Sequence, residues 1–61
     1  MNNRFIIYTL YNGEFDERTE STNDIIAALE AVAIYLRDPD CCHACIEDLH
    51  TGAIILRYWQ D

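Results

Sequence analysis

Hydrophobic and polar positions first predict a β-hairpin at the N-terminal end of the chain. Residues 4–11 (RFIIYTLY) are aromatic and β-branched, which favours a strand, and they run directly into Asn12-Gly13. Asn-Gly is the dipeptide that best tolerates positive φ at both centres of a type I′ turn. Tyr11 should therefore lie opposite Glu14, with a return strand that continues to about Thr19. The same register pairs Leu10 with Phe15, Thr9 with Asp16 and Tyr8 with Glu17.

A helix is predicted next, because apolar residues recur every three to four positions. Ser21 or Thr22 offers an N-cap, and Asp24 falls in the first turn, where a carboxylate complements the helix dipole. The helix should run from about Asn23 to Arg37 and end before Pro39, since the residue before a proline is disfavoured in the α conformation. The expected core stripe is Ile25, Leu29, Val32 and Leu36, flanked by Ile26, Ala28, Ala33 and Tyr35.

The last third of the chain predicts a second hairpin. Strands from about His43 to Leu49 and from about Ala53 to Trp59 flank a turn at Gly52, in which Asp48 can accept bonds from turn amides. On the last strand, alternation places Ile54, Leu56 and Tyr58 on one face and Ile55, Arg57 and Trp59 on the other. The order of elements is ββαββ, which predicts a single small α+β domain over residues 1–61, with one helix packed on an antiparallel sheet.

Charge restricts the classes of partner. The 61 residues carry 11 Asp and Glu against 4 Arg and no Lys, a formal net charge of -7. Nucleic-acid affinity rests on Arg and Lys contacts to phosphates, so direct binding of DNA or RNA is not expected. The same field repels anionic lipid surfaces and attracts basic protein surfaces, particularly grooves built to hold nucleic acid.

Apolar stretches and cysteines predict a cytoplasmic protein. The longest apolar stretch, Ile25–Leu36, is interrupted by Glu30 and falls short of the ~20 residues that a membrane span needs. The apolar run after Arg4 has no small-residue cleavage site, so no signal peptide is expected. Three cysteines cannot all pair within one chain, and a reducing compartment would keep them as thiols.

The segment Cys41–Cys45 (CCHAC), with His50 nearby, is the one cluster that resembles metal-ligand chemistry. A structural zinc site needs four ligands, usually from two separated pairs, and a second Cys pair is missing. If this segment is a strand, Cys42 and Cys45 lie on opposite faces and cannot share an ion. We therefore expect no metal and no cofactor, and thiols that pack as small hydrophobic groups.

Catalysis is not expected either. His43 and His50 are the acid–base candidates, with Glu47 and Asp48 as their nearest carboxylates. The chain has neither a GxSxG motif nor a phosphate-cradling glycine loop, and each of its two glycines is explained by a turn. So small a chain also has little depth for a pocket that excludes water.

The carboxylates are the strongest chemical feature, and they have two interpretations. They can form a solvated face that only maintains solubility, or they can form a binding surface. The absence of Lys favours the second, because surface acids are normally mixed with it. On a strand, Glu14 and Asp16 would lie ~6.8 Å apart on one face, a spacing suited to imitating a line of phosphates. The candidate partner-binding residues are Glu14, Asp16, Glu17, Glu20, Asp24, Asp38, Asp40 and Glu47.

The helix offers an alternative interaction surface. Ala27, Ala31 and Ile34 are predicted to point away from the core stripe, and small residues permit close approach of a partner. Three occupants fit this face: a partner helix, a second copy of the chain, or a part of the chain that folds back over it. The alternative function is therefore a small self-associating interaction or regulatory module, with a homodimer through the helix face as one arrangement, in which acidity serves only solubility.

As a type, the chain resembles small acidic phage-encoded anti-CRISPR proteins of the DNA-mimic kind. The resemblance rests on the length of the whole chain, the missing Lys, the compact αβ pattern and the acidic run GEFDERTESTND over residues 13–24. Such inhibitors typically occupy the basic DNA-binding channel of a CRISPR surveillance complex and have no enzymatic activity. The resemblance therefore implies a non-enzymatic inhibitor that acts in the host cytoplasm and competes with DNA.

Overall fold

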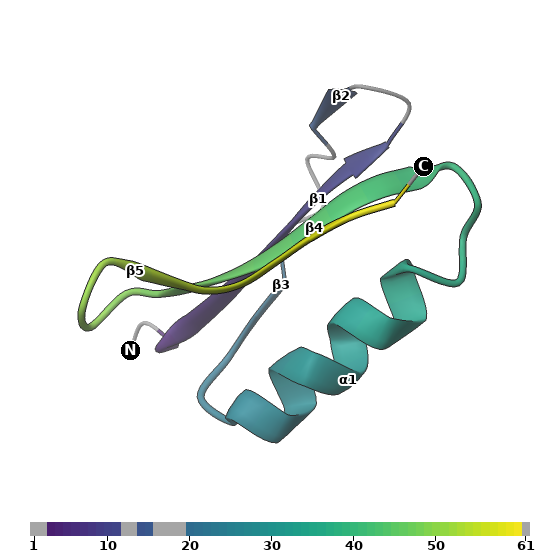
Figure 1. Ribbon diagram of the computed structural model, residues 1–61. Helices are drawn as coiled ribbons and strands as arrows, with labels where there is room; N and C mark the ends of the chain where they lie inside the picture. Colours follow the sequence, from purple (N-terminus) through teal and green to yellow (C-terminus); the bar gives the residue numbers. More distant parts are fainter. Residues whose placement is uncertain (1–2, 12–13, 16–19, 61) are drawn as a thin grey trace.

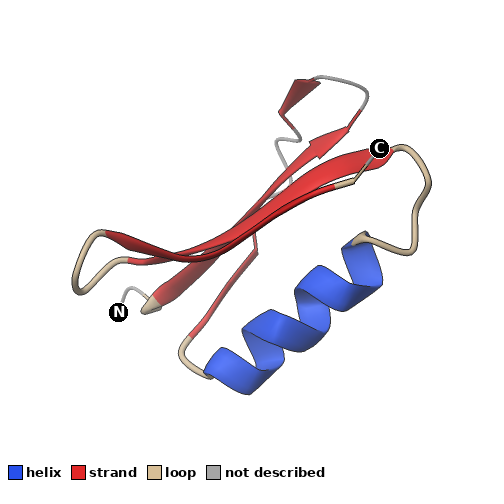
Figure 2. Cartoon of the chain, viewed as in Figure 1, coloured by secondary structure: helices blue, strands red, loops and turns tan. Residues whose placement is uncertain are grey.

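One helix packs against one face of an antiparallel sheet, giving two layers (Figure 1, Figure 2). The computed structural model describes residues 3–11, 14–15 and 20–60. Its elements are β1 (Phe5–Tyr11), β2 (Glu14–Phe15), β3 (Glu20–Thr22), α1 (Ile25–Tyr35), β4 (Cys41–Asp48) and β5 (Ala53–Trp59). The predicted α+β class and ββαββ order are confirmed, with the return strand of the first hairpin present as the two pieces β2 and β3.

The order of strands gives the sheet two edges of opposite character. β1 lies between β4 and the pair β2 and β3, and β5 pairs with the far side of β4. The short strands β2 and β3, which carry Glu14 and Glu20, therefore lie at one edge of the sheet. The apolar β5 forms the other edge (Figure 1).

The first hairpin has the register that its turn residues predict. Tyr11 lies opposite Glu14, and Leu10 opposite Phe15. Continuing this register would place Glu20 opposite Phe5, but Thr22 occupies that position, two residues further along the chain. The shift arises between β2 and β3, and the predicted partners Asp16 and Glu17 fall outside the described residues.

The predicted start of the helix was wrong. Ser21 and Thr22 belong to β3 and pair with β1, so neither of them caps the helix. The N-cap is Asp24. The Asp24 carboxylate accepts the Ile26 backbone N–H at 2.9 Å, while the Thr22 hydroxyl accepts the Asp24 N–H at 3.1 Å. The helix thus begins at Ile25 and ends at Tyr35, two residues inside each predicted boundary.

The core lies between α1 and the inner face of the sheet. Its buried members come from β1, β4 and α1: Phe5, Ile7, Ala44, Ile46, Ala28 and Val32. The predicted helix stripe was wrong for Ile26 and Leu29, which are exposed, and for Ala31, which packs against the core. The helix is apolar on nearly all sides, so its periodicity could not choose the buried face. The fully buried Ala28 lies at the centre of that face, where a small side chain allows close approach to the sheet.

The second hairpin confirms the predicted turn and last strand. Gly52 has a φ of 75°, which favours glycine, and the Asp48 carboxylate accepts the His50 N–H at 2.9 Å. β4 spans Cys41–Asp48, so it begins two residues before the predicted start at His43 and ends one residue before Leu49.

A β-bulge changes which residues of β5 face the helix. Ile46 pairs with Leu56 and Glu47 pairs with Ile54, so Ile55 is an extra residue without a partner on β4. Leu56 and Tyr58 therefore face the helix, whereas Ile54 lies on the outer face beside Glu47. The prediction that Ile54 shares a face with Leu56 was wrong, because strict alternation does not hold across a bulge.

Candidate protein-interaction surfaces

Asp48 has a structural role that removes it from the acidic surface. Arg4 Nη2 lies 2.9 Å from Asp48 Oδ2, and Arg4 Nε donates to Oδ1 at 3.1 Å. These two parallel bonds fasten the start of β1 to the end of β4, where Phe5 pairs with Asp48. The bond from Arg4 is the main reason that the pKa of Asp48 falls to about 2.

Two predicted acidic residues precede the helix in the chain: Asp24 caps its first turn, whereas Glu20 bonds to its last residue. Glu20 is exposed on β3, and its Oε2 accepts a bond from the Tyr35 hydroxyl at 2.7 Å. Asp24 is exposed at the helix N-cap, where its carboxylate is oriented by the Ile26 amide. Both carboxylates are thus positioned by hydrogen bonds within the protein.

Two further predicted residues lie beyond the other end of the helix. Asp38 Oδ1 accepts the Asp40 N–H at 2.9 Å, and the Asp38 carbonyl accepts the Cys41 N–H at 3.0 Å. These bonds form a tight turn around Pro39 that carries both exposed carboxylates. The 11 residues of α1 separate this pair from Asp24, a helix length of ~16 Å.

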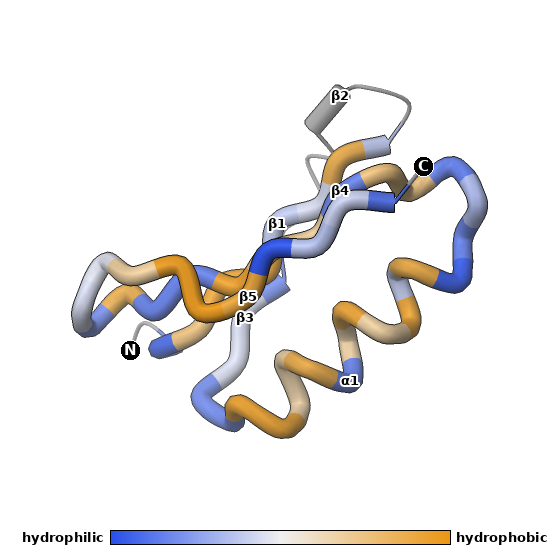
Figure 3. Tube along the Cα trace, viewed as in Figure 1, coloured by the Kyte–Doolittle hydropathy of each residue, from blue (hydrophilic) through white to orange (hydrophobic). Residues whose placement is uncertain are grey.

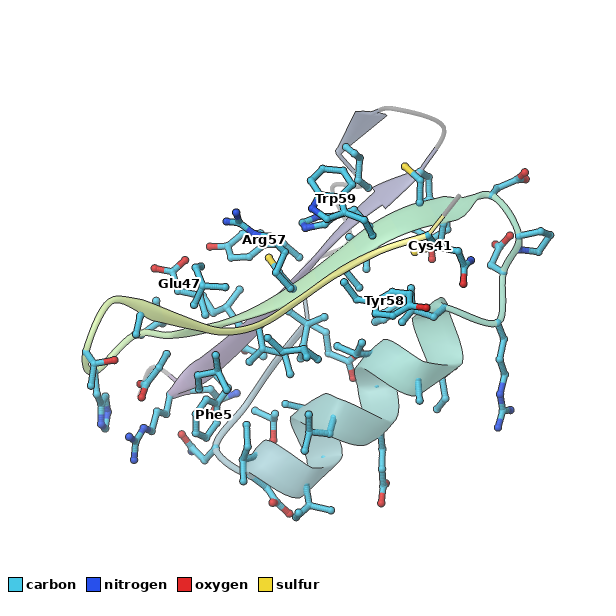
Figure 4. All side chains as sticks on the ribbon, in the orientation of Figure 1. Phe5, Cys41, Glu47, Arg57, Tyr58 and Trp59 are labelled. Carbon is cyan, nitrogen blue, oxygen red and sulfur yellow. The ribbon has the colours of Figure 1, made fainter. Side chains whose placement is uncertain are left out.

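Of the remaining predicted residues, Glu47 and Glu14 lie on the sheet, and the other two fall outside the described residues. Glu47 is half-buried on the outer face of the sheet, where Figure 4 shows it on the same side as Arg57 and Trp59. Glu14 lies on β2, at the sheet edge, and Asp16 and Glu17 fall outside the described residues. We call Glu20, Asp24, Asp38 and Asp40 the acidic side of the protein.

Few cations neutralise the acidic side. Within residues 3–11 and 20–60, the Arg4–Asp48 contact is the one salt bridge shorter than 4 Å. This contact pairs one of the four arginines, Arg4, with Asp48, which is not part of the acidic side. Sequence reasoning also left aside Glu30, an exposed carboxylate on the helix between the two ends, because it was considered only as an interruption of an apolar stretch.

In the cysteine segment, the thiols of Cys41 and Cys42 donate to different backbone carbonyls. Cys41 Sγ donates to the His43 carbonyl at 3.5 Å and Cys42 Sγ donates to the Leu10 carbonyl at 3.3 Å. A shift in register between Leu10 and Tyr11 leaves Cys42 without a pairing residue on β1. The prediction that Cys42 and Cys45 lie on opposite faces assumed strict alternation, and this shift interrupts it. The described part of the chain holds no group of three or more His, Cys, Asp or Glu side chains that could bind a metal ion.

Burial shapes the chemistry of His43 and Cys45, whereas His50 is exposed. Burial, with the nearby Arg57, lowers the pKa of His43, whose ring lies 4.1 Å from that of Trp59. Burial raises the pKa of the Cys45 thiol, which favours the unreactive protonated form. His50 is exposed in the second hairpin loop and offers its backbone amide to Asp48.

Metal removal should leave the protein unchanged. We expect the purified protein to melt at the same temperature with and without a chelator. The thiols of Cys41 and Cys42 bond to different carbonyls, and the fold is stabilised by the core between the helix and the sheet. Thermal unfolding followed by circular dichroism, together with elemental analysis, measures this. Stoichiometric zinc, or a melting temperature lowered by several degrees on chelation, would show that a structural metal contributes to folding.

Large apolar side chains are exposed on both layers. On α1 these include Ile26 and Ile34, and on β5 they include Ile54, Ile55, Tyr58 and Trp59. Figure 3 shows the apolar run of β5 and the apolar residues spread along α1. Among the described residues no helix is long and apolar enough to span a bilayer.

The fold and its surfaces define a small α+β domain with an acidic side and an apolar sheet edge. Comparison with protein-family models, with curated proteins and with solved structures found no match to this chain.

Proposed function

We propose that this protein is a non-enzymatic inhibitor that binds a basic nucleic-acid-binding surface of a larger complex and blocks DNA binding. A CRISPR surveillance complex is the target class that the sequence resemblance suggests. The proposal rests mainly on the exposed, unneutralised carboxylates of the acidic side in a chain of net charge -7.

The acidic side has the properties that competition with DNA requires. Asp24 and Asp38 are held by backbone amides at the helix N-cap and in the turn after the helix. Carboxylates that are already oriented lose little side-chain entropy when they meet arginine or lysine, so more of the electrostatic attraction contributes to affinity. Their fixed positions at both ends of α1 present negative charge over a length comparable to several phosphates.

The His43 and Cys45 environments support a role without catalysis. A buried imidazole stacked on Trp59 and a buried protonated thiol are poor candidates for a general base and a nucleophile. The protein would act by occupying a surface, so its inhibition should be stoichiometric and reversible.

Neutralising three of the four carboxylates of the acidic side should weaken inhibition without unfolding the protein. The variant combines Asp24→Asn, Asp38→Asn and Asp40→Asn, because Asn retains both the N-cap and the turn acceptor while removing three charges. We expect the wild type to displace a fluorescent DNA duplex from a purified surveillance complex, and the variant to do so at least about tenfold more weakly. Displacement by the wild type should also weaken steeply as salt is raised.

Arg37→Gln is the matched control, since it removes a charge of opposite sign from the same end of the helix. This variant should displace DNA at least as well as the wild type. Circular dichroism establishes that each variant is folded. The proposal fails if the triple variant competes as well as the wild type, or if the wild type displaces no DNA at low salt.

A further inference from the structure

The outer edge of β5 carries unpaired backbone groups. β5 pairs with β4 on one side, and no described strand pairs with the other. Beyond the end of β5, the Gln60 N–H donates to the Cys42 carbonyl at 2.8 Å. Because amides alternate in direction along a strand, those of Tyr58 and Leu56 also face β4. The amides of Arg57 and Trp59 therefore face the open edge.

The ring contact between His43 and Trp59 agrees with this assignment. These two residues are register partners, and their ring centroids lie 4.1 Å apart. Side chains approach most closely at pairs that do not exchange backbone hydrogen bonds. Trp59 thus directs its N–H and carbonyl away from β4.

The edge has few of the features that normally prevent strands from pairing, and they leave its second half open. β5 (AIILRYW) has no proline, no lysine and no acidic residue, and its one charge is Arg57. The bulge lies at Ile55, which leaves Leu56–Trp59 as a regular stretch. Tyr58 is 49% exposed and Trp59 63% exposed, so apolar surface accompanies the open backbone groups.

We propose that two copies of this chain associate through their β5 edges, antiparallel about a two-fold axis at Tyr58. The two sheets then become one continuous sheet. The proposal concerns a surface distinct from the acidic side, and it holds or fails independently of the proposed inhibition of DNA binding.

The direction of the amides selects the register. Residues with outward amides must face one another to exchange hydrogen bonds, which allows an axis at any residue of Leu56–Trp59. An axis at Leu56 would set Arg57 opposite the bulged Ile55. An axis at Trp59 would set Arg57 opposite a position beyond the end of β5, so Arg57 and Tyr58 remain. An axis at Arg57 would oppose two guanidinium groups, which is unfavourable. An axis at Tyr58 places Arg57 opposite Trp59 of the second copy, so the two symmetry-related pairs exchange backbone bonds and set a guanidinium beside an indole.

Charge favours a second copy over other occupants of this edge. Two chains of net charge -7 repel each other at most approaches. β5 has a positive residue as its only charge, and the acidic edge formed by β2 and β3 lies on the opposite side of the sheet. Pairing through β5 therefore keeps the acidic edges of the two copies apart, whereas a basic partner would meet Arg57.

Sedimentation equilibrium tests the proposal with two variants of one residue. The wild type at about 100 μM should approach twice the 7.1 kDa of one chain, with a dissociation constant in the roughly micromolar range of small interfaces. Arg57→Pro removes the outward N–H and leaves the bonds to β4, so it should be monomeric with unchanged circular dichroism. Arg57→Ala retains that N–H and loses only the guanidinium, so its dissociation constant should rise several-fold.

Disulfide cross-linking tests the register and does not depend on the proline variant folding. Tyr58→Cys places a thiol on the two-fold axis at a pair without hydrogen bonds, so mild oxidation should give a covalent dimer. Ile34→Cys, on the exposed helix face, is the control and should remain uncross-linked, as should the wild type. A monomeric wild type at this concentration, or cross-linking at position 34 instead of position 58, would overturn the proposal.

Discussion

Replacing Ile46 by alanine should leave much of the protein unfolded at room temperature. Ile46 is fully buried at the centre of β4, between its register partners Ile7 on β1 and Leu56 on β5. Truncating a buried isoleucine to alanine costs about 2–5 kcal/mol, because the cavity left behind is only partly filled by relaxation. A domain of this size has a total stability of only about 3–5 kcal/mol, so the loss is comparable to the whole.

Urea denaturation followed by circular dichroism measures the effect, with Ile34→Ala as the control. Ile34 is 61% exposed on α1, and alanine is a strong helix former, so this change should alter stability by no more than about 0.5 kcal/mol. Similar losses from the two variants would mean that the core is not where the structure places it.

Lowering the pH from about 4 to about 2 should destabilise the wild type more than it destabilises the Asp48→Asn variant. Arg4 lowers the pKa of the folded-state Asp48 carboxyl from its ordinary 3.8 to about 2. As the pH falls below about 4, the unfolded chain takes up this proton first, and the folded state loses stability relative to it. The contribution of Asp48 is therefore complete above the unfolded pKa and is lost as the pH falls through about 2.

The asparagine variant keeps an acceptor for the His50 amide and leaves Arg4 without its ion pair. It should be less stable than the wild type at neutral pH, and the difference should narrow as the pH falls from about 4 to about 2. Urea midpoints measured across this range give the comparison, with the exposed Asp40→Asn as control. If the difference between wild type and Asp48→Asn stays constant with pH, the carboxylate does not stabilise the fold through Arg4.

Local chemistry made several elements predictable. Asn12-Gly13 is compatible with one tight hairpin loop, so the pairing of Tyr11 with Glu14 follows from the turn alone. Gly52 and the Asp48 side chain likewise specify the second turn, and the predicted limits of β5 agree with the structure. In each case the decisive interaction joins residues only a few positions apart.

Composition indicated an acidic surface but not its location. The predicted helix placed Asp24 and Asp38 near its two ends, but the sequence did not show that backbone amides at the N-cap and in the following turn orient their carboxylates. The sequence predicts a turn role for Asp48, but it does not show the ion pair with Arg4, 44 positions away. Partners so distant in sequence leave no local signal.

Turn chemistry, periodicity and composition act locally, so the amino-acid sequence is enough to predict the class of fold, the register of the first hairpin, the turn at Gly52 and the sign of the net charge. Three features follow only from the folded arrangement: which face of the apolar helix is buried, where bulges interrupt the alternation of the strands, and which strand lies at the sheet edge. These features depend on packing and pairing between distant segments. Ala28 enters the core and Leu29 does not because the sheet meets the helix on that side.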